Sequence, residues 1–288
     1  EPKTSVLEYR SREEAIMDLE QKYTLSVQAL KDYAQQAGFN EVVLGLSGGI
    51  DSALVAVMCV DAFGADRVHA YMLPGPYSTD HSLTDAEELG ANLGIKTEAI
   101  SIVGPYEAFV AALEPAAGGK LSGLASENTQ ARCRMVCLMA LSNTYGWMMV
   151  NTGNKSEAAM GFSTLYGDTS GAFAPIGGLY KTDVFALSRW VNERAAAEGK
   201  VPPIPEHIIT KPPSAELSPD AEDEKALGID YATLDQILIA HFEQGKPAEE
   251  IVAAGFDPEE VAYAIRRTNS YAFKRAVEPP FPEAKFYD

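Results

Sequence analysis

Short apolar runs alternate with amphipathic stretches along the first half of the chain. The apolar runs predict buried strands at residues 42–46, 67–73, 96–102 and 147–152. Apolar residues at helical spacing predict helices at 14–36, 51–63, 83–94, 106–113 and 127–145. Because strands alternate with helices, we expect an α/β fold: a doubly wound parallel sheet with helices on both faces.

The second half of the chain is predicted to be mainly helical, with helices at 180–197, 231–244 and 258–275. Residues 162–181 are rich in glycine and lack periodicity, which predicts a long functional loop. We interpret residues 162–178 of this loop as a mobile lid that excludes water from a reactive intermediate. Residues 201–225 are rich in proline and acidic residues, and they predict an extended, solvated connection.

Two polar segments each follow a predicted strand: the glycine turn at 47–49 and the sequence Asn-Thr-Gly-Asn-Lys-Ser-Glu at 151–157. Ligands bind beyond the carboxyl ends of parallel strands, near the point where the strand order reverses. We therefore expect both segments to converge on one site.

The net charge and composition limit the kinds of partner that the protein is expected to bind. The 288 residues carry a formal net charge of −18, with an isoelectric point near 4.6. Such an acidic surface argues against binding to nucleic acid or to an anionic membrane, both of which attract basic proteins. No apolar run approaches the roughly 18 residues of a membrane span, and no signal peptide opens the chain. We expect a cytoplasmic protein that has no contact with a membrane.

The three cysteines, Cys59, Cys133 and Cys137, form no paired framework, which is typical of a reducing compartment. Cys133 and Cys137 are four residues apart and would share one face of a helix. Two buried thiols are favoured over a metal or redox pair, because no histidine cluster lies nearby in the sequence.

The chemistry begins at residues 47–52, Ser-Gly-Gly-Ile-Asp-Ser. Glycines in the turn let backbone N–H groups approach an anion, and the following helix directs its positive end at the same place. A Walker-type phosphate loop would supply a lysine here, whereas this turn supplies Asp51. A carboxylate beside phosphate requires a cation between them, and Mg²⁺ binds in this manner. Glu157 is the leading candidate for a second carboxylate ligand; the alternative is an ordinary strand-to-helix turn capped by Asp51.

These segments resemble a known family. Residues 47–52 resemble the pyrophosphate loop of the N-type ATP pyrophosphatases. The segments at 151–157, 166–182, 209–217 and 273–275 look like those of an NAD synthetase, and residues 79–95 and 126–134 are most similar to the synthetase module of the glutamine-dependent kind. The resemblance covers residues 25–278. It leaves 1–24 as an extension or interdomain connector and 279–288 as a C-terminal tail.

The resemblance implies the reaction of nicotinic acid adenine dinucleotide, ATP and ammonia to give NAD, AMP and pyrophosphate. It implies ATP as a co-substrate, Mg²⁺ as a cofactor held by Asp51 and Glu157, and catalytic roles for Asp51 and Lys181. Contacts to ATP are implied for Ser47, Gly48, Gly49, Ile50, Asp51, Ser52, Thr152, Lys181 and Ser214. Contacts to the dinucleotide are implied for Asn128, Arg132, Asp168 and Lys274.

The sequence departs from the pattern of the family in two places. Gly75 and Pro76 stand where a serine and an arginine are usual, so an arginine contact to ATP is missing or comes from elsewhere. Phe273 stands where a histidine is common, which puts one substrate contact in doubt.

Three other readings stay open. One is another amidotransferase synthetase with the same loop, of the GMP or asparagine synthetase type. Another is an RNA-thiolating enzyme, although such an enzyme calls for a basic face and reactive cysteines. The last is a non-catalytic nucleotide-binding module, which the presence of both carboxylates and of Lys181 disfavours.

The resemblance also bears on assembly and on the source of nitrogen. It implies a homodimer with the substrate site near the subunit interface. The chain starts at Glu1 rather than at Met, and its first residues are similar to the connector that leads out of a glutaminase. We expect a C-terminal module of a longer precursor that, taken alone, uses ammonia and not glutamine. The alternative is a stand-alone ammonia-using enzyme.

Overall fold

Four parallel strands form the central sheet of the computed structural model, which describes residues 17–219 and 222–287. The strands are β1 (Val42–Gly45), β2 (Val68–Met72), β3 (Thr97–Ala99) and β4 (Met148–Met149), in the order β3-β2-β1-β4. The order changes direction at β1, so the carboxyl ends of β1 and β4 meet at the position where sheets of this kind bind ligands.

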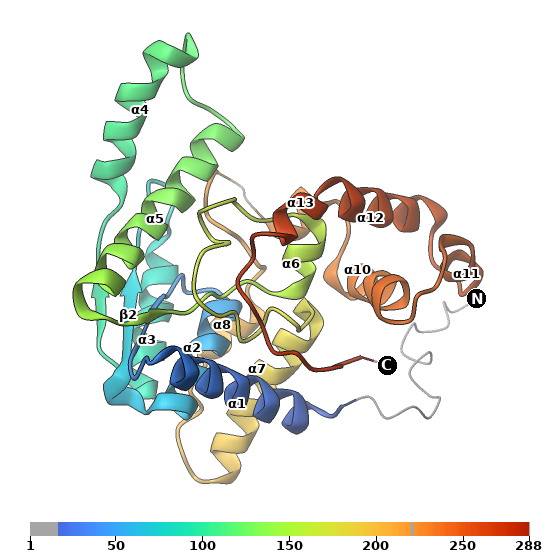
Figure 1. The fold of residues 1–288 in the computed structure, drawn as a ribbon, viewed down its shortest axis with the longest axis horizontal. Helices are drawn as coiled ribbons and strands as arrows, with labels where there is room; N and C mark the ends of the chain where they lie inside the picture. The colour runs from blue at the N-terminus through green and yellow to red at the C-terminus, as the bar shows by residue number, and fades with distance from the viewer. Residues whose placement is uncertain (1–16, 220–221, 288) are drawn as a thin grey trace.

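Helices follow and surround the strands (Figure 1). The first group consists of α1 (Leu19–Ala37), α2 (Ile50–Phe63), the 3₁₀ turn η2 (Ala65–Arg67), α3 (Asp80–Leu93), α4 (Val103–Ala117), α5 (Leu124–Tyr145), α6 (Lys155–Met160) and α7 (Lys181–Ala197). The second group consists of α8 (Glu206–Thr210), α9 (Asp223–Leu227), α10 (Tyr231–Leu238) with its π-helical continuation η3 (Ile239–Glu243), α11 (Ala248–Ala253), α12 (Pro258–Ser270) and α13 (Ala272–Arg275).

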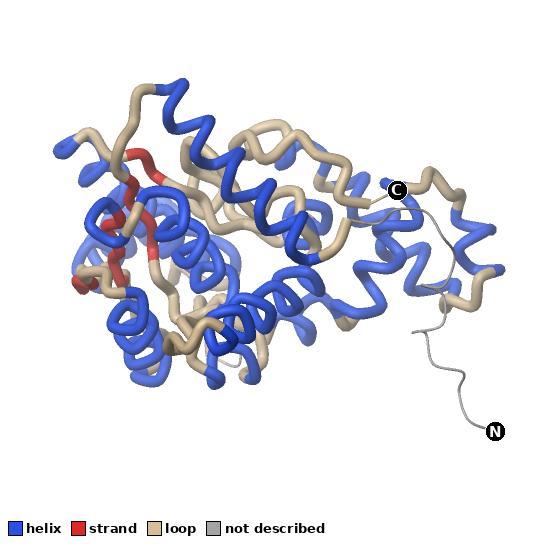
Figure 2. The backbone as a smooth tube through the Cα atoms, turned by 90° about the horizontal axis from the view of Figure 1, so that it is seen from below, coloured by secondary structure: helices blue, strands red, loops and turns tan. Residues whose placement is uncertain are grey.

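Alternation along β1 divides the interior into two cores. Val42 and Leu44 pack in the larger core with α1, α2 and α7, whereas Val43 packs in a smaller core with Cys133 and Leu138 of α5. Successive side chains of a strand point to opposite faces, so both faces of the sheet are buried. Figure 2 shows helices around the strands, and the predicted doubly wound α/β fold is confirmed.

The helix expected to begin at residue 14 begins at Leu19. The Asp18 side chain accepts a hydrogen bond from the Gln21 N–H, and the Gln21 side chain accepts one from the Asp18 N–H. This reciprocal cap stabilises the first turn and fixes where the helix starts. Residues 14–16, and most of the connector predicted at 1–24, lie outside the described residues.

The loop predicted at 162–181 has no regular helix, but its second half is not a lid. Phe173 and Leu179 are buried in the larger core, and the Ala172 N–H donates to the Met149 carbonyl oxygen at 2.8 Å. The Asn151 N–H donates in turn to the Phe173 carbonyl oxygen. Residues 172–173 thus extend the sheet beside β4, and opening them would expose core side chains.

Other elements also differ from the expectations. The connection predicted at 201–225 contains α8 and the start of α9, and α11 had not been predicted at all. α4 is longer than predicted, and none of its side chains is buried, although Phe109, Val110 and Leu113 are apolar. It projects from the body at the upper left of Figure 1. Among the helices of the described residues, none is both long and apolar enough to cross a bilayer.

The last residues belong to the folded body. Phe286 and Tyr287, which the sequence analysis assigned to a tail beyond the domain, are buried in the larger core. In Figure 1 the segment from residue 277 onward leaves α13 as a dark red coil and crosses the molecule toward α1 and α7.

Candidate active site

The turn between β1 and α2 is built around Gly48. Its φ is +75°, and a Cβ atom there would lie 2.3 Å from the Ser82 carbonyl oxygen, so only glycine fits. The Ser47 hydroxyl accepts from the Gly49 N–H and lies 3.1 Å from the Ser52 hydroxyl. No side chain caps α2 at Gly49, which leaves the amides of its first turn directed at the cavity. The turn therefore has the form of an anion-binding site.

Three charged side chains from three elements meet beyond the strand ends. Lys181, the first residue of α7, places its Nζ 2.5 Å from Asp51 Oδ2 and 3.5 Å from Glu157 Oε1. Asn154 links the two carboxylates, because its Nδ2 donates to Asp51 Oδ1 at 2.9 Å and its backbone N–H donates to Glu157 Oε2. The expected convergence of 47–52 and 151–157 is thus present.

Burial shifts the pKa values of the ionisable side chains in this cluster. It is the main cause that raises the pKa of Glu157 to about 8, and the neighbouring Asp51 carboxylate adds to the shift. Burial alone would lower the pKa of Lys181, but Asp51 and Glu157 hold it above its ordinary value. Asp223 faces the same cluster, and burial raises its pKa to about 6. Three carboxyl groups crowd around one ammonium, and a further cation would favour their charged forms.

The fit of the site to Mg²⁺ depends on oxygen donors that face one point. Asp51 and Glu157 supply them, and both carboxylates are held by Asn154. Mg²⁺ binds proteins through one or two carboxylates together with phosphate oxygens. No group of three or more His, Cys, Asp or Glu side chains with the geometry of a metal site occurs among the described residues. The donor set therefore suits an ion that takes its remaining ligands from water or from a phosphate.

Asp235 of α10 fixes the two helices that carry Glu157 and Lys181. Its Oδ1 accepts from the Ser156 hydroxyl, and its Oδ2 accepts from the Thr182 N–H at 2.8 Å. Ser156 Oγ also accepts from the Lys181 N–H at 2.8 Å. The amides at the start of α7 are thereby satisfied by side chains of α6 and α10, which holds Lys181 opposite Glu157.

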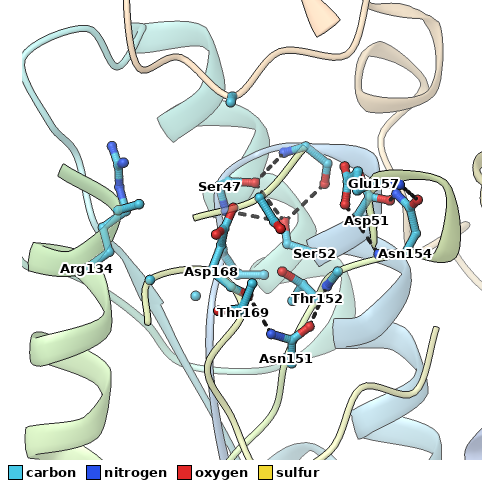
Figure 3. Close-up of a pocket in the computed structure, with 18 of the residues that line it drawn as sticks. Ser47, Asp51, Ser52, Arg134, Asn151, Thr152, Asn154, Glu157, Asp168 and Thr169 are labelled. Carbon is cyan, nitrogen blue, oxygen red and sulfur yellow. Dashed lines mark hydrogen bonds between the residues drawn. The ribbon is translucent and has the colours of Figure 1, made fainter. Parts of the chain in front are cut away.

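A cavity of about 340 Å³ lies over this cluster. Its walls are apolar where Leu73, Leu138 and Met149 line it, and polar at the glycine turn. Figure 3 shows Asp51, Glu157 and Asn154 at one side of the cavity and Arg134 at the opposite side. An apolar wall that ends in charged groups suits a nucleotide, whose base is flat and whose phosphates are anionic.

The predicted ATP contacts lie mostly at this cavity. It is lined by Ser47, Gly49, Ile50, Asp51, Ser52, Thr152, Lys181 and Ser214, and by the metal candidate Glu157. Gly48 does not line it and instead packs against the backbone of Ser82.

The four predicted dinucleotide contacts divide into two kinds. Asp168 lines the cavity, and burial raises its pKa to about 6. Asn128 Oδ1 accepts from the Thr164 hydroxyl, Arg132 Nε donates to the Leu165 carbonyl oxygen, and Lys274 Nζ donates to the Gly161 and Ser163 carbonyl oxygens. The last three side chains hold the loop at 161–165 rather than line the cavity.

Sequence reasoning missed other lining residues: Arg134, Lys211, Glu216 and Asp223. Arg134 is the most informative, because a Cβ atom on Gly75 would lie 2.9 Å from Arg134 Nη2. Gly75 therefore makes room for a guanidinium that reaches the second strand end from α5. The signal was the missing arginine at Gly75–Pro76 together with a second arginine in the segment Ala-Arg-Cys-Arg.

Known proteins resemble this chain over most of its length. Residues 22–278 match the family model described as NAD synthase. The glutamine-dependent NAD(+) synthetase of Thermotoga maritima is 42% identical over 259 residues, which are 89% of this chain and 44% of that protein. The chain thus spans about half the length of the curated relatives it matches.

Two solved structures have the same fold. The glutamine-dependent NAD+ synthetase of Acinetobacter baumannii, in complex with adenosine diphosphate, gives a TM-score of 0.66 at 36% identity, covering 96% of this chain and 49% of that chain. The NH3-dependent NAD synthetase of Campylobacter jejuni gives a TM-score of 0.70 at 30% identity, covering 90% of this chain and 96% of that chain.

Proposed function

Because the chain belongs to the NAD synthase family, we propose that it amidates nicotinic acid adenine dinucleotide to NAD at the expense of ATP. The proposed products are NAD, AMP and pyrophosphate, and ammonia is the nitrogen donor. The observation that carries the proposal is the meeting of Asp51, Glu157 and Lys181 beside an uncapped helix start at the end of β1. We propose the cytoplasm as its location, in keeping with three free thiols among the described residues.

The proposed chemistry has two steps. A carboxylate resists attack by ammonia, because the group that would have to leave is an oxide. Its oxygen therefore attacks the α-phosphorus of ATP, forms an acyl-adenylate and releases pyrophosphate. Ammonia then adds to the acyl carbon, the bond to AMP breaks, and loss of a proton gives the amide. The apolar residues of the cavity wall would limit access of water to the proposed adenylate.

The roles of the site residues follow from their charges. The amides of the glycine turn and the Lys181 ammonium suit the β- and γ-phosphates, where negative charge grows as pyrophosphate leaves. Asp51 and Glu157 would hold Mg²⁺, which when bound neutralises phosphate charge. Thr152 and Ser214 add hydroxyl donors along the same wall. The adenosine diphosphate in the Acinetobacter baumannii relative supports a nucleotide at this site.

Asn128, Arg132 and Lys274 are proposed to serve the dinucleotide by shaping its pocket. All three bond the loop at 161–165. That loop leads to Asp168, whose carboxylate accepts from the Thr164 N–H at the cavity wall. Arg134, which lines the opposite wall, is proposed to supply the arginine contact that Gly75 and Pro76 lack.

Ammonia is the proposed donor because no cysteine of the described residues lines the cavity. Hydrolysis of glutamine by a coupled enzyme commonly uses a cysteine that a neighbouring base activates. Cys59 is fully buried in α2, and burial raises the pKa of Cys133 and of Cys137. None of these cysteines lines the cavity. The NH3-dependent relative from Campylobacter jejuni, which this chain covers almost completely, supports the same choice.

Assembly as a homodimer is part of the proposal. α4 exposes Phe109 and Leu113, and α5 exposes Leu124, Val136 and Tyr145. Large apolar side chains that are exposed on α4 and on the adjoining start of α5 are typical of an interface. The second copy would cover this surface, which we call the α4–α5 face.

One assay with separate arms tests the reaction. The chain is incubated with ATP, Mg²⁺ and ammonium chloride, and with nicotinic acid adenine dinucleotide, xanthosine monophosphate or aspartate as the acid. AMP release that depends on the first acid supports the proposal. Release that depends on xanthosine monophosphate instead would identify a GMP synthetase type of enzyme. Release that no acid triggers would overturn the assignment.

A second arm replaces ammonium chloride with ammonia-free glutamine. The proposed donor predicts NAD with ammonium and none with glutamine alone. Equal yields from the two donors would overturn the ammonia assignment while leaving the amidation reaction in place.

A further inference from the structure

The C-terminal segment at 277–287, here called the strap, lies almost wholly beyond the residues that match the family model. It nevertheless forms part of the cavity wall through Glu278, Pro279 and Phe281. Its Pro280 carbonyl oxygen accepts from the Ala174 N–H at 2.9 Å. The strap is therefore bonded to the loop that leads from α6 to Lys181.

Close packing joins the strap to the same loop. A Cβ atom on Gly177 would lie 2.8 Å from Phe281 Cβ, and one on Gly178 would lie 2.8 Å from the Phe286 ring. Glycines at both positions let the strap rest directly on the loop backbone. Phe286 is 2% exposed, so this contact belongs to the core.

Tyr287 connects the strap to the start of α7. Its hydroxyl oxygen accepts from the Tyr180 N–H at 2.9 Å, and its O–H donates to Asp183 Oδ2. Tyr180 is the N-cap residue of α7 and Lys181 is the first residue of the helix. One hydroxyl group therefore bridges the residues on either side of Lys181 and satisfies an amide that no side chain of α7 caps.

Lys22 of α1 completes the arrangement. Its Nζ lies 2.7 Å from Asp183 Oδ2 and 4.2 Å from the centre of the Tyr287 ring. Lys22, Asp183 and Tyr287 are all more than nine-tenths buried. A buried ion pair with a satisfied hydroxyl donor is rigid, and Asp183 of this group lies in the first turn of α7.

We propose that Tyr287 is a positioning residue for the reaction: it holds the start of α7 so that Lys181 meets Asp51 and the phosphates of ATP. This inference rests on the proposed function. Tyr287 touches neither the cavity nor Lys181 Nζ, so it acts through the backbone of α7. A displacement of a catalytic group by about 1 Å can slow a reaction about 100-fold.

The test compares two tyrosine hydroxyls in the full chain. Tyr287→Phe removes the bridge and keeps the ring in the core. Tyr263→Phe is the matched control, because the Tyr263 hydroxyl donates to the Leu227 carbonyl oxygen at 2.6 Å, away from α7. We expect Tyr287→Phe to lower kcat about 10- to 100-fold, with a smaller effect on KM for ATP. Tyr263→Phe should leave kcat within about twofold.

A double-mutant cycle with Lys181→Ala separates positioning from general destabilisation. If Tyr287 acts through Lys181, adding Tyr287→Phe to Lys181→Ala lowers the rate no further. An additional loss equal to that seen in the wild-type background would overturn the proposal. Turnover by the wild-type chain together with an unchanged kcat in Tyr287→Phe would also overturn it and leave the proposed function standing.

If the wild-type chain releases no AMP, a measurement that does not depend on turnover tests the positioning role of Tyr287. The ammonium resonance of Lys181 is assigned by nuclear magnetic resonance through its loss in Lys181→Ala. The proposal predicts that Tyr287→Phe shifts this resonance and that Tyr263→Phe does not. An unchanged resonance in Tyr287→Phe overturns the positioning role whatever the reaction is.

Discussion

Asp51 and Glu157 are the residues from which the catalytic hypothesis can be tested most directly, because both share Lys181 as a partner. We expect Asp51→Asn and Glu157→Gln each to lower pyrophosphate release at least about 100-fold, since each removes a charge that the cation and the phosphates require. Circular dichroism should stay unchanged. Asp66→Asn, at an exposed position, is the control. Near-normal turnover of either variant at saturating Mg²⁺ would contradict the metal assignment.

The protonation of Glu157 makes stability depend on pH. Its pKa lies near 8 in the folded chain, above the ordinary value of 4.5, chiefly because of burial. Between these values the folded state holds a proton that the unfolded state has released. The free energy of unfolding therefore falls as pH rises through this window. We expect the wild-type Tm, measured without divalent ions, to fall more steeply than that of Glu157→Gln between about pH 5 and pH 9. If the Tm of the wild-type chain and that of Glu157→Gln fall equally with pH, Glu157 is not the source of the pH dependence.

Lys181 should affect the rate more than binding. A donor aimed at charge that develops in a transition state typically contributes about 100- to 1000-fold in rate. We expect Lys181→Ala to lower the single-turnover rate by that factor and to weaken ATP binding much less. Lys200→Ala, at an exposed side chain, is the control. The prediction fails if the single-turnover rate is unchanged while affinity for ATP collapses.

At the scale of elements, a strand or helix could be predicted correctly where the residues that define it are neighbours in the sequence. The strand at 42–45 and the helix at 50–63 agree with prediction within one residue, because an apolar run, two glycines and a second, longer apolar stretch define them. Pairing of 172–173 with β4 could not be predicted, because it depends on contacts between segments that meet only in the folded sheet.

The site could be predicted to the same extent. Asp51 and Glu157 were found from sequence motifs, whereas Asp235 and Tyr287 bond backbone groups that are distant in the sequence.

The glycine turn allows a prediction with a built-in control. Gly48 and Gly94 both have positive φ, but a Cβ atom on Gly48 would overlap the Ser82 backbone, whereas one on Gly94 would meet nothing within 4 Å. Gly94→Ala should cost about 1 kcal/mol of stability and leave ATP affinity unchanged. Gly48→Ala should cost more and weaken ATP binding about tenfold or further, because the turn or α3 must move. Calorimetry with ATP and thermal denaturation measure both effects. Equal behaviour of the two variants would argue against a close-approach role for Gly48.

At the scale of the whole molecule, the exposed apolar side chains are distributed unevenly. Among the described residues, five of the thirteen large apolar side chains that are exposed lie on α4 and α5. α4 has no buried side chain of its own. A helix this apolar gains little from folding against one neighbour and would expose its other side to water. We therefore propose the α4–α5 face as the surface that a second copy of the chain covers.

A charge placed on this face should disrupt the proposed dimer. Replacing Leu124, which is 73% exposed, with Glu should leave the folded chain intact, because no core contact is lost. It should convert a dimer into a monomer, because an unpaired carboxylate would be buried on association. Val201→Glu is the matched control: Val201 is 67% exposed but lies after α7.

Sedimentation velocity at about 10 μM would show a dimer for the wild-type chain and for Val201→Glu, and a monomer for Leu124→Glu. A wild-type chain that sediments as a monomer, or a Leu124→Glu variant that stays dimeric, would remove the α4–α5 face from consideration. In the second case the interface would have to lie on another surface of the molecule.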